Sequence, residues 1–148
     1  MYIGIDPGKT GAAVLYSENS GVVDWIDYED PLTVANKLRD WTQHDITLAI
    51  LEKVHAMPKQ GVSTTFKFGA NYGVWQGVLA ALKIPHELIT PRTWQKGLIT
   101  KSDGKDTKER SLNVARRFFP SSDFLRLKKH HNRADAALMA VFASRRKG

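Results

Sequence analysis

Residues 1–16, MYIGIDPGKTGAAVLY, decide the fold, because they predict two strands joined by a tight turn. Gly8-Lys9-Thr10 is similar to the end of a phosphate-binding loop. That loop requires a glycine five positions before Gly8, where this chain has Ile3, and a helix directly after it. The sequence instead continues as a short apolar run. We therefore expect a β-hairpin with Asp6 near the end of its first strand, and no nucleotide cofactor.

The rest of the chain predicts a mixed sheet with helices on its faces. A nearly continuous apolar run, ITLAILEKV, is typical of a buried central strand. Apolar residues at helical spacing predict four helices. The expected elements are strands over Tyr2–Asp6, Gly11–Tyr16 and Val22–Tyr28, a helix over Pro31–Trp41, a strand over Ile46–Val54, a helix over Thr64–Lys83, a strand over Glu87–Thr90, and helices over Asp106–Phe119 and Ala134–Ala143. We expect one α/β domain over residues 1–148, whose first three strands are antiparallel.

Three glycines, Gly69, Gly73 and Gly77, recur every four residues in the expected helix and so share one of its faces. Each costs about 1 kcal/mol relative to alanine inside a helix. Close approach of another backbone is the usual compensation. A second helix of the same chain, its own sheet or a partner subunit would each provide it.

Composition and charge favour a protein that binds nucleic acid. The 148 residues include no cysteine, and no apolar run approaches the roughly 20 residues that span a bilayer. With no signal-like segment at Met1, we expect a cytoplasmic protein without a membrane partner. The net charge is +7, and it is unevenly spread: residues 1–91 hold 7 Lys/Arg and 10 Asp/Glu, whereas residues 92–148 hold 15 and 5. Such a basic C-terminal part predicts a polyanionic partner.

Three acids interrupt segments that should be buried. Asp6 ends the first strand, Glu52 lies near the end of the central strand, and Asp135 lies in the last, almost wholly apolar helix. A buried carboxylate needs a cation, a set of hydrogen bonds or a raised pKa. If the two strands are neighbours, Asp6 and Glu52 meet at one end of the sheet, and the helix adds Asp135. Clustered carboxylates select hard cations such as Mg²⁺, and beside a basic surface they indicate phosphodiester chemistry.

Three segments in this order, IGIDPGKTG, ILEKV and HNRADAALMA, resemble the RuvC family of Holliday junction resolvases, within the RNase H-like superfamily. The resemblance covers nearly the whole chain. It implies an RNase H-like fold and a homodimeric endonuclease that cuts four-way DNA junctions by paired nicks. It also implies two Mg²⁺ ions per site, with Mn²⁺ as a substitute, held by Asp6, Glu52 and Asp135. The small size suits a phage- or prophage-encoded protein as well as a nucleoid-associated cellular one.

The chain departs from the family pattern at the fourth site residue. The family places an acid or a histidine three or four residues before the last aspartate, and this chain has Asn132 and His131 there. We favour His131, as a metal ligand or a proton carrier. The resemblance also implies that Lys108 helps to bind the scissile phosphate. Further residues expected to contact DNA are Lys9, His55, Lys105, Lys128, Lys129 and Arg133, with His55 standing where some relatives carry an aromatic residue.

Three other functions fit parts of the sequence. A nuclease of the same superfamily that cuts flaps, forks or RNA–DNA hybrids would use the same acids. Sugar and acetate kinases of the actin-like type also begin with a strand, a turn and a strand around an aspartate, but they need two large lobes, which 148 residues cannot supply. A DNA-binding protein without catalytic activity would keep the acids for stability alone.

Overall fold

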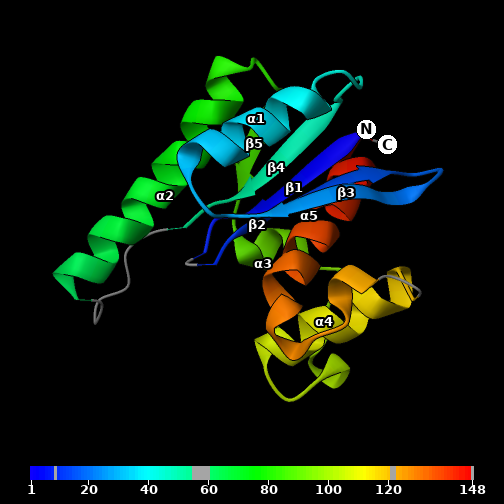
Figure 1. Ribbon diagram of the computed structural model, residues 1–148. Helices are drawn as coiled ribbons and strands as arrows, with labels where there is room; N and C mark the ends of the chain where they lie inside the picture. The colour runs from blue at the N-terminus through cyan, green and yellow to red at the C-terminus, as the bar shows by residue number, and fades with distance from the viewer. Residues whose placement is uncertain (9, 55–60, 121–122, 148) are drawn as a thin grey trace.

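A five-stranded mixed sheet forms the centre of the protein (Figure 1). The computed structural model describes residues 1–8, 10–54, 61–120 and 123–147. The strands are β1 (Tyr2–Asp6), β2 (Ala12–Ser17), β3 (Gly21–Asp27), β4 (Leu48–Glu52) and β5 (His86–Ile89), in the order β3-β2-β1-β4-β5. The first three are antiparallel, and β1 pairs with β4, and β4 with β5, in parallel. The predicted α/β architecture is confirmed, and this strand order is that of the RNase H-like fold.

Helices cover both faces of the sheet, as predicted (Figure 1). One face carries α1 and α2, and the other carries α3, α4 and α5. Single turns of 3₁₀ helix, η1, η2 and η3, connect the segments around α4 and α5. The bounds are α1 Pro31–Trp41, α2 Val62–Ala81, α3 Pro91–Gln95, η1 Lys101–Asp103, α4 Thr107–Phe118, η2 Asp123–Leu125, η3 Lys128–His130 and α5 His131–Lys147.

The alternation of side chains along β1 and β4 separates two hydrophobic cores. Ile3 and Ile5 pack with α1 and α2, whereas Ile50 packs with α4 and α5. The closest approach lies at Gly4, where an added Cβ would stand 1.9 Å from the carbonyl oxygen of Ala136. Glycine has no side chain at this position, and this allows α5 to lie almost in contact with the backbone of β1. The last helix is therefore buried, as its apolar sequence predicts.

The structure differs from the sequence prediction in one additional helix and in the bounds of several elements, such as β4, which is shorter than the predicted strand. A short helix, α3, follows β5, and it begins with Thr90 as the N-cap and Pro91 in the first turn, both of which are standard start signals. The last helix begins at His131 rather than Ala134. Asp106 caps α4 through the N–H of Glu109, but the Glu109 carboxylate accepts from the N–H of Lys105 and not from that of Asp106. The Glu109 carboxylate thus bonds to the residue before the N-cap rather than to the N-cap itself.

The glycine stripe of α2 does not face the chain's own sheet. Gly69, Gly73 and Gly77 are exposed, and an added Cβ at any of them would meet nothing within 4 Å. The N-terminal half of the helix extends beyond the sheet (Figure 1). Packing against the described part of the same chain is therefore not the reason for these glycines.

Within the described residues, no helix has both the length and the apolar content that crossing a bilayer requires.

Candidate active site

Asp6 lies at the carboxyl end of β1, under α5, and only 5% of its surface is exposed. The turn that follows it holds its carboxylate: the N–H of Gly8 donates to Oδ1 at 2.9 Å. The N–H of Gly11 then donates to the carbonyl of Gly8, and β2 starts antiparallel to β1. The predicted hairpin turn is confirmed, and its geometry fixes one oxygen of the acid.

Glu52 ends β4, the parallel neighbour of β1, so the two acids meet at one edge of the sheet. Its Oε2 accepts a hydrogen bond of 2.7 Å from the indole N–H of Trp94, which is wholly buried in α3. This bond ties one carboxylate oxygen to a rigid ring and leaves the other free. Sequence reasoning missed Trp94, because it did not identify the start signal of α3.

Asp135 reaches the same region from α5. Its Oδ1 is buried and has no hydrogen-bond partner in the described part of the chain. The hydroxyl of Ser111, a buried residue of α4, lies at its carboxylate and acts to lower its pKa. An unpaired buried oxygen is costly, and the chemistry that best satisfies it is a cation. Ser111 is a second site residue that the sequence did not reveal, since one serine on a helix carries no signal.

The three acids influence one another's ionisation. Burial raises the pKa of Asp6 to about 6, although the bonds from Gly8 and Asp135 oppose this. Burial, and then the charge of Asp6, raise the pKa of Glu52 to about 7. The pKa of Asp135 lies well above its usual range, because of burial first and the charge of Asp6 second. The structure therefore brings the three predicted acids together.

These carboxylates fit a hard divalent cation in their chemistry. All three offer oxygen ligands, and the orphaned Oδ1 of Asp135 is an unused one. Among the described residues, however, no three His, Cys, Asp or Glu side chains stand close enough to hold one ion as they lie. Small side-chain movements would be needed for the predicted ligand set to converge.

His131 stands beside the acids in sequence but faces a different neighbourhood. Burial, and then the charge of Lys108, lower its pKa, while Asp106 opposes them. None of the three acids is among these causes. His131 lines a basic cavity of about 620 Å³ between α4 and η3. Its predicted role as a fourth metal ligand stays a prediction, and Asn132, the alternative, bonds to Thr10 instead.

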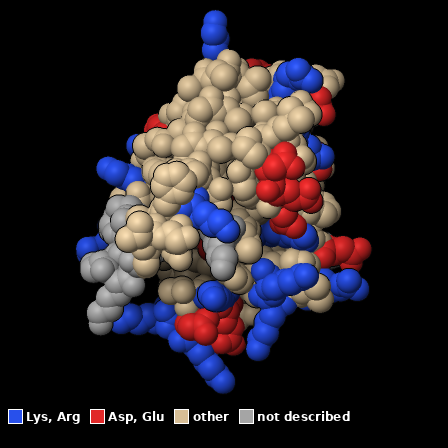
Figure 2. Space-filling model, turned by 60° about the vertical axis from the view of Figure 1, so that its left-hand side comes forward, with Lys and Arg blue, Asp and Glu red and all other residues tan. Residues whose placement is uncertain are grey.

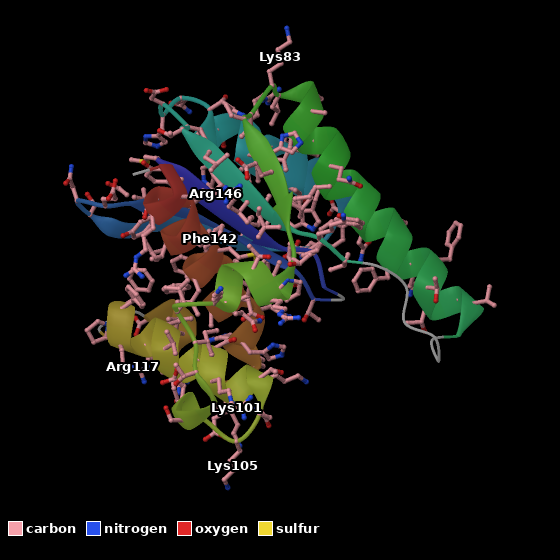
Figure 3. The ribbon with its side chains drawn as sticks, turned by 180° about the vertical axis from the view of Figure 1, so that it is seen from behind. Lys83, Lys101, Lys105, Arg117, Phe142 and Arg146 are labelled. Carbon is pink, nitrogen blue, oxygen red and sulfur yellow. The ribbon has the colours of Figure 1, made fainter. Side chains whose placement is uncertain are left out.

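The basic cavity collects most of the lysines that the sequence singled out. Its cationic lining is Lys105, Lys108, Arg116, Lys128 and Lys129. Lys and Arg crowd the lower half of the molecule, over α4 and the start of α5, while the upper half is largely uncharged (Figure 2). Lys101 and Lys105 point outward at this lower end, and Lys83 projects from the opposite end (Figure 3). The uneven charge of the sequence thus becomes a basic region next to the acids.

Two of the expected DNA contacts, Lys9 and His55, lie outside the described residues. Arg133 is described, but its guanidinium is already engaged. It makes a two-bonded ion pair with Asp27, at 2.9 and 2.6 Å, and donates to the carbonyl of Phe124 at 3.0 Å. Three of its five N–H donors are therefore engaged within the chain, which limits its part in a phosphate contact.

Solved structures share this fold over nearly the whole chain. One, described as "T. thermophilus RuvC in complex with Holliday junction substrate", superimposes with a TM-score of 0.66 and 13% sequence identity, covering 98% of this chain and 94% of that one. A second, described as "Thermus thermophilus RuvC structure", gives 0.60 and 15%, covering 98% and 95%. Protein-family models and curated protein sequences give no match. The similarity that the sequence motifs indicate is therefore confirmed at the level of structure: this chain has the fold of the RuvC resolvase.

Proposed function

We propose that this protein is a metal-dependent endonuclease that cuts branched DNA, chiefly four-way junctions, by paired nicks. The observation that carries the proposal is the set of three buried acids with raised pKa values beside a basic cavity. Buried acids whose pKa values are displaced together typically mark functional sites. The fold supports the choice of substrate, since one protein that shares it is solved with a Holliday junction.

Asp6, Glu52 and Asp135 would hold two Mg²⁺ ions, which Mn²⁺ could replace. When bound, such a pair supplies the activation of the attacking water and the stabilisation of the leaving oxygen. The chain's own contribution is positioning. The N–H of Gly8 fixes one oxygen of Asp6, and the indole of Trp94 fixes one oxygen of Glu52, so the orientation of each carboxylate is defined.

The basic cavity would bind the strand that is cut. Its lining offers four ammonium groups to phosphates. Two come from the α4 side, Lys105 and Lys108, and two from η3, Lys128 and Lys129. The lowered pKa of His131 keeps its ring neutral at neutral pH. A neutral imidazole can take a proton from water or serve as a metal ligand.

Paired nicks require two active sites, and we propose that the exposed face of α2 joins two copies of the chain. This face carries the three open glycines and two apolar side chains that protrude into solvent, Val62 at 89% and Phe66 at 76% exposure. Apolar side chains that are neighbours on one exposed helix face offer a contact surface to a second copy. The glycines would let a second α2 approach closely, which compensates for their cost in the helix.

The test is a cleavage and binding assay with three labelled DNAs: a four-way junction, a linear duplex of the same sequence and an RNA–DNA hybrid. Wild type with Mg²⁺ should nick the junction symmetrically and leave the other two intact, and EDTA should abolish the nicks. Asp6→Asn should bind the junction but cut it at least about 1000-fold more slowly, because one metal ligand loses its charge. Light scattering should show that Phe66→Glu converts a dimer into a monomer, which would cut single strands without pairing the nicks.

Each contrary result has a defined meaning. Cleavage of the hybrid or of a flap, with the junction intact, would keep the site and replace the substrate. Cleavage of none of them with any divalent metal, with junction binding preserved, would leave a structure-specific DNA-binding protein. Asp6→Asn that cuts as fast as wild type would remove Asp6 from the site.

A further inference from the structure

Two hollows flank η3 and share Lys129, but their linings differ in chemistry. The basic cavity described above lies on one side of η3, and five cations line it. On the other side lies a hollow of about 530 Å³. We name it the aromatic hollow, after its main lining residues. They are Trp25, Tyr28, Asp27, Arg133, Leu127 and Lys129.

The aromatic hollow contains a layered arrangement of flat groups. The Arg133 guanidinium lies over the indole of Trp25, 5.8 Å from its centroid. The ring of Phe124 lies 5.2 Å from the same indole at an interplanar angle of 34°. The two-bonded pairing of Arg133 with Asp27 holds the guanidinium in place. Three of its five N–H donors are engaged by Asp27 and Phe124, so this guanidinium offers the hollow mainly a flat surface.

The hollow starts next to the acids. Thr10, in the turn that follows Asp6, and Asn132, one helical turn before Asp135, both line it. The amide of Asn132 donates to the carbonyl of Thr10 at 3.0 Å, so the two form a wall shared with the active site. A group in the hollow would therefore lie directly beside the strand at the acids.

We propose that the aromatic hollow takes one unpaired nucleobase of the strand that is cut, beside the scissile phosphate. This inference rests on the proposed nuclease function, and it adds the place at which the protein holds one base of the substrate. Bases stack on aromatic rings and on guanidinium planes, which is the surface that Trp25 and Arg133 present. Lys129 and Arg126 at the same hollow supply donors for the base edge or its phosphate. His130 adds another: its Nδ1 accepts from the N–H of Leu127 at 3.1 Å, so the neutral ring carries its proton on Nε2.

The two hollows would then divide the substrate between them. Five cations and two acids, Asp106 and Glu109, line the basic cavity, and no salt bridge within the described residues engages those cations, which suits the sugar–phosphate backbone. In the aromatic hollow the Arg133 charge is neutralised by Asp27, and rings make up much of the lining. A base gains most from such a surface, because stacking needs flat faces and not net charge.

The experiment is an abasic scan of the junction, measured by fluorescence anisotropy in EDTA so that binding is read without cleavage. Single abasic sites replace each nucleotide within a few positions of the nick. Wild type should lose roughly tenfold in affinity at one position and little elsewhere, as expected for the loss of one stacked base. Arg133→Lys keeps the charge and removes the planar group. Leu127→Glu places a carboxylate at a side chain that is 41% exposed, so folding is preserved.

Both variants should bind the intact junction more weakly and show no further loss at that abasic position. Arg117→Lys is the matched control, because Arg117 pairs with Asp103 at 2.7 Å and lines neither hollow. It should behave as wild type. A 5-iodouracil at the sensitive position should photo-crosslink to Trp25 or Tyr28, as located by mass spectrometry.

Equal losses at all positions in wild type, or an abasic loss that persists in Arg133→Lys and Leu127→Glu, would overturn the base site alone, with the nuclease function intact. Failure of wild type to bind any unmodified branched DNA would instead overturn the proposed function, and the base site with it.

Discussion

Along β1, Ile3 and Ile5 point towards α1 and α2, while Gly4 and Asp6 point towards α5. On β4, Leu51 faces the first side and Glu52 the second. The α1/α2 side is filled by large apolar residues in ordinary contact. The α5 side combines the tight approach of α5 to Gly4 with three buried acids. One pair of strands thus supplies a conventional core on one face and the costly groups of the active site on the other.

The difference shows how the buried acids are tolerated. Buried carboxylates with raised pKa values reduce stability at neutral pH, since their charged forms are disfavoured. The hydrophobic residues on the α1/α2 side contribute stability without any such cost. Substitutions on the two faces should therefore differ in kind: the α1/α2 side should lose only stability, whereas the α5 side should also change metal binding, pH dependence and cleavage.

The largest effect should come from Gly4→Ala. Its Cβ would lie 1.9 Å from the Ala136 carbonyl oxygen and 2.5 Å from the Ala140 nitrogen, so α5 would have to move away from β1. We expect a loss of about 4 kcal/mol or more in the free energy of unfolding. Gly73→Ala is the control, and a dilute, monomeric sample should gain about 1 kcal/mol, because nothing lies near that position and alanine favours the helix. Urea unfolding measures both. Equal stability of the two variants would show that α5 does not approach β1 this closely.

The second prediction concerns pH in the absence of divalent metal. The folded protein keeps a proton on Asp6 up to about pH 6 and on Glu52 up to about pH 7, whereas the unfolded chain releases both near pH 4. The folded state therefore binds more protons in this window, and stability falls as pH rises through it. For Glu52 alone the loss is about 3 kcal/mol by pH 8. Added Mg²⁺ should restore part of it.

Other groups act in the opposite direction, so the comparison must be made between variants. The pKa values of His130 and His131 are lowered, which makes stability rise with pH below about 6.5. Thermal denaturation of wild type and Glu52→Gln from pH 4 to pH 8 isolates the carboxylate. Glu52→Gln should become the more stable of the two above pH 7. If it is the less stable one at every pH, Glu52 is a stabilising charge and the site is wrongly assigned.

The sequence predicted the parts of this molecule that depend on local pattern. Strand β1 and helix α1 have the predicted bounds, and the pairing of β1 with β4 follows from one hairpin and one buried apolar run. The meeting of Asp6, Glu52 and Asp135 was predicted because acids in apolar segments are conspicuous. Each of these predictions depends on the pattern within one segment or on the rule that parallel strands end at the same edge of a sheet.

What the sequence did not reveal depends on contacts between segments far apart in the chain. Trp94 lies 42 residues from Glu52, and Arg133 lies 106 residues from Asp27. No periodicity connects such pairs. For that reason Arg133 was predicted to contact DNA, although the structure shows it in an ion pair. The glycine stripe of α2 was noticed correctly, but only the structure shows that it faces outward.

Two buried tryptophans provide the finest comparison of the two faces. Trp75 and Trp94 are both fully buried, but the indole N–H of Trp75 has no partner in the described chain, while that of Trp94 donates to Glu52. Trp→Phe at either position removes the same ring volume, so the packing part of the stability loss should be similar. Only Trp94→Phe also frees the Glu52 carboxylate.

We therefore expect Trp94→Phe to need roughly tenfold more Mg²⁺, both for half-maximal cleavage and for half of the metal-induced rise in melting temperature. Trp75→Phe should keep the wild-type Mg²⁺ requirement in both measurements, and it should lose less stability than Trp94→Phe because it removes an unsatisfied donor. The melting measurement contains no DNA, so it separates the position of Glu52 from any effect on substrate binding. If the two variants have the same Mg²⁺ requirement, the bond from Trp94 to Glu52 contributes nothing to the metal site. The buried tryptophan on the α5 side would then contribute only to packing, like the one on the α1/α2 side.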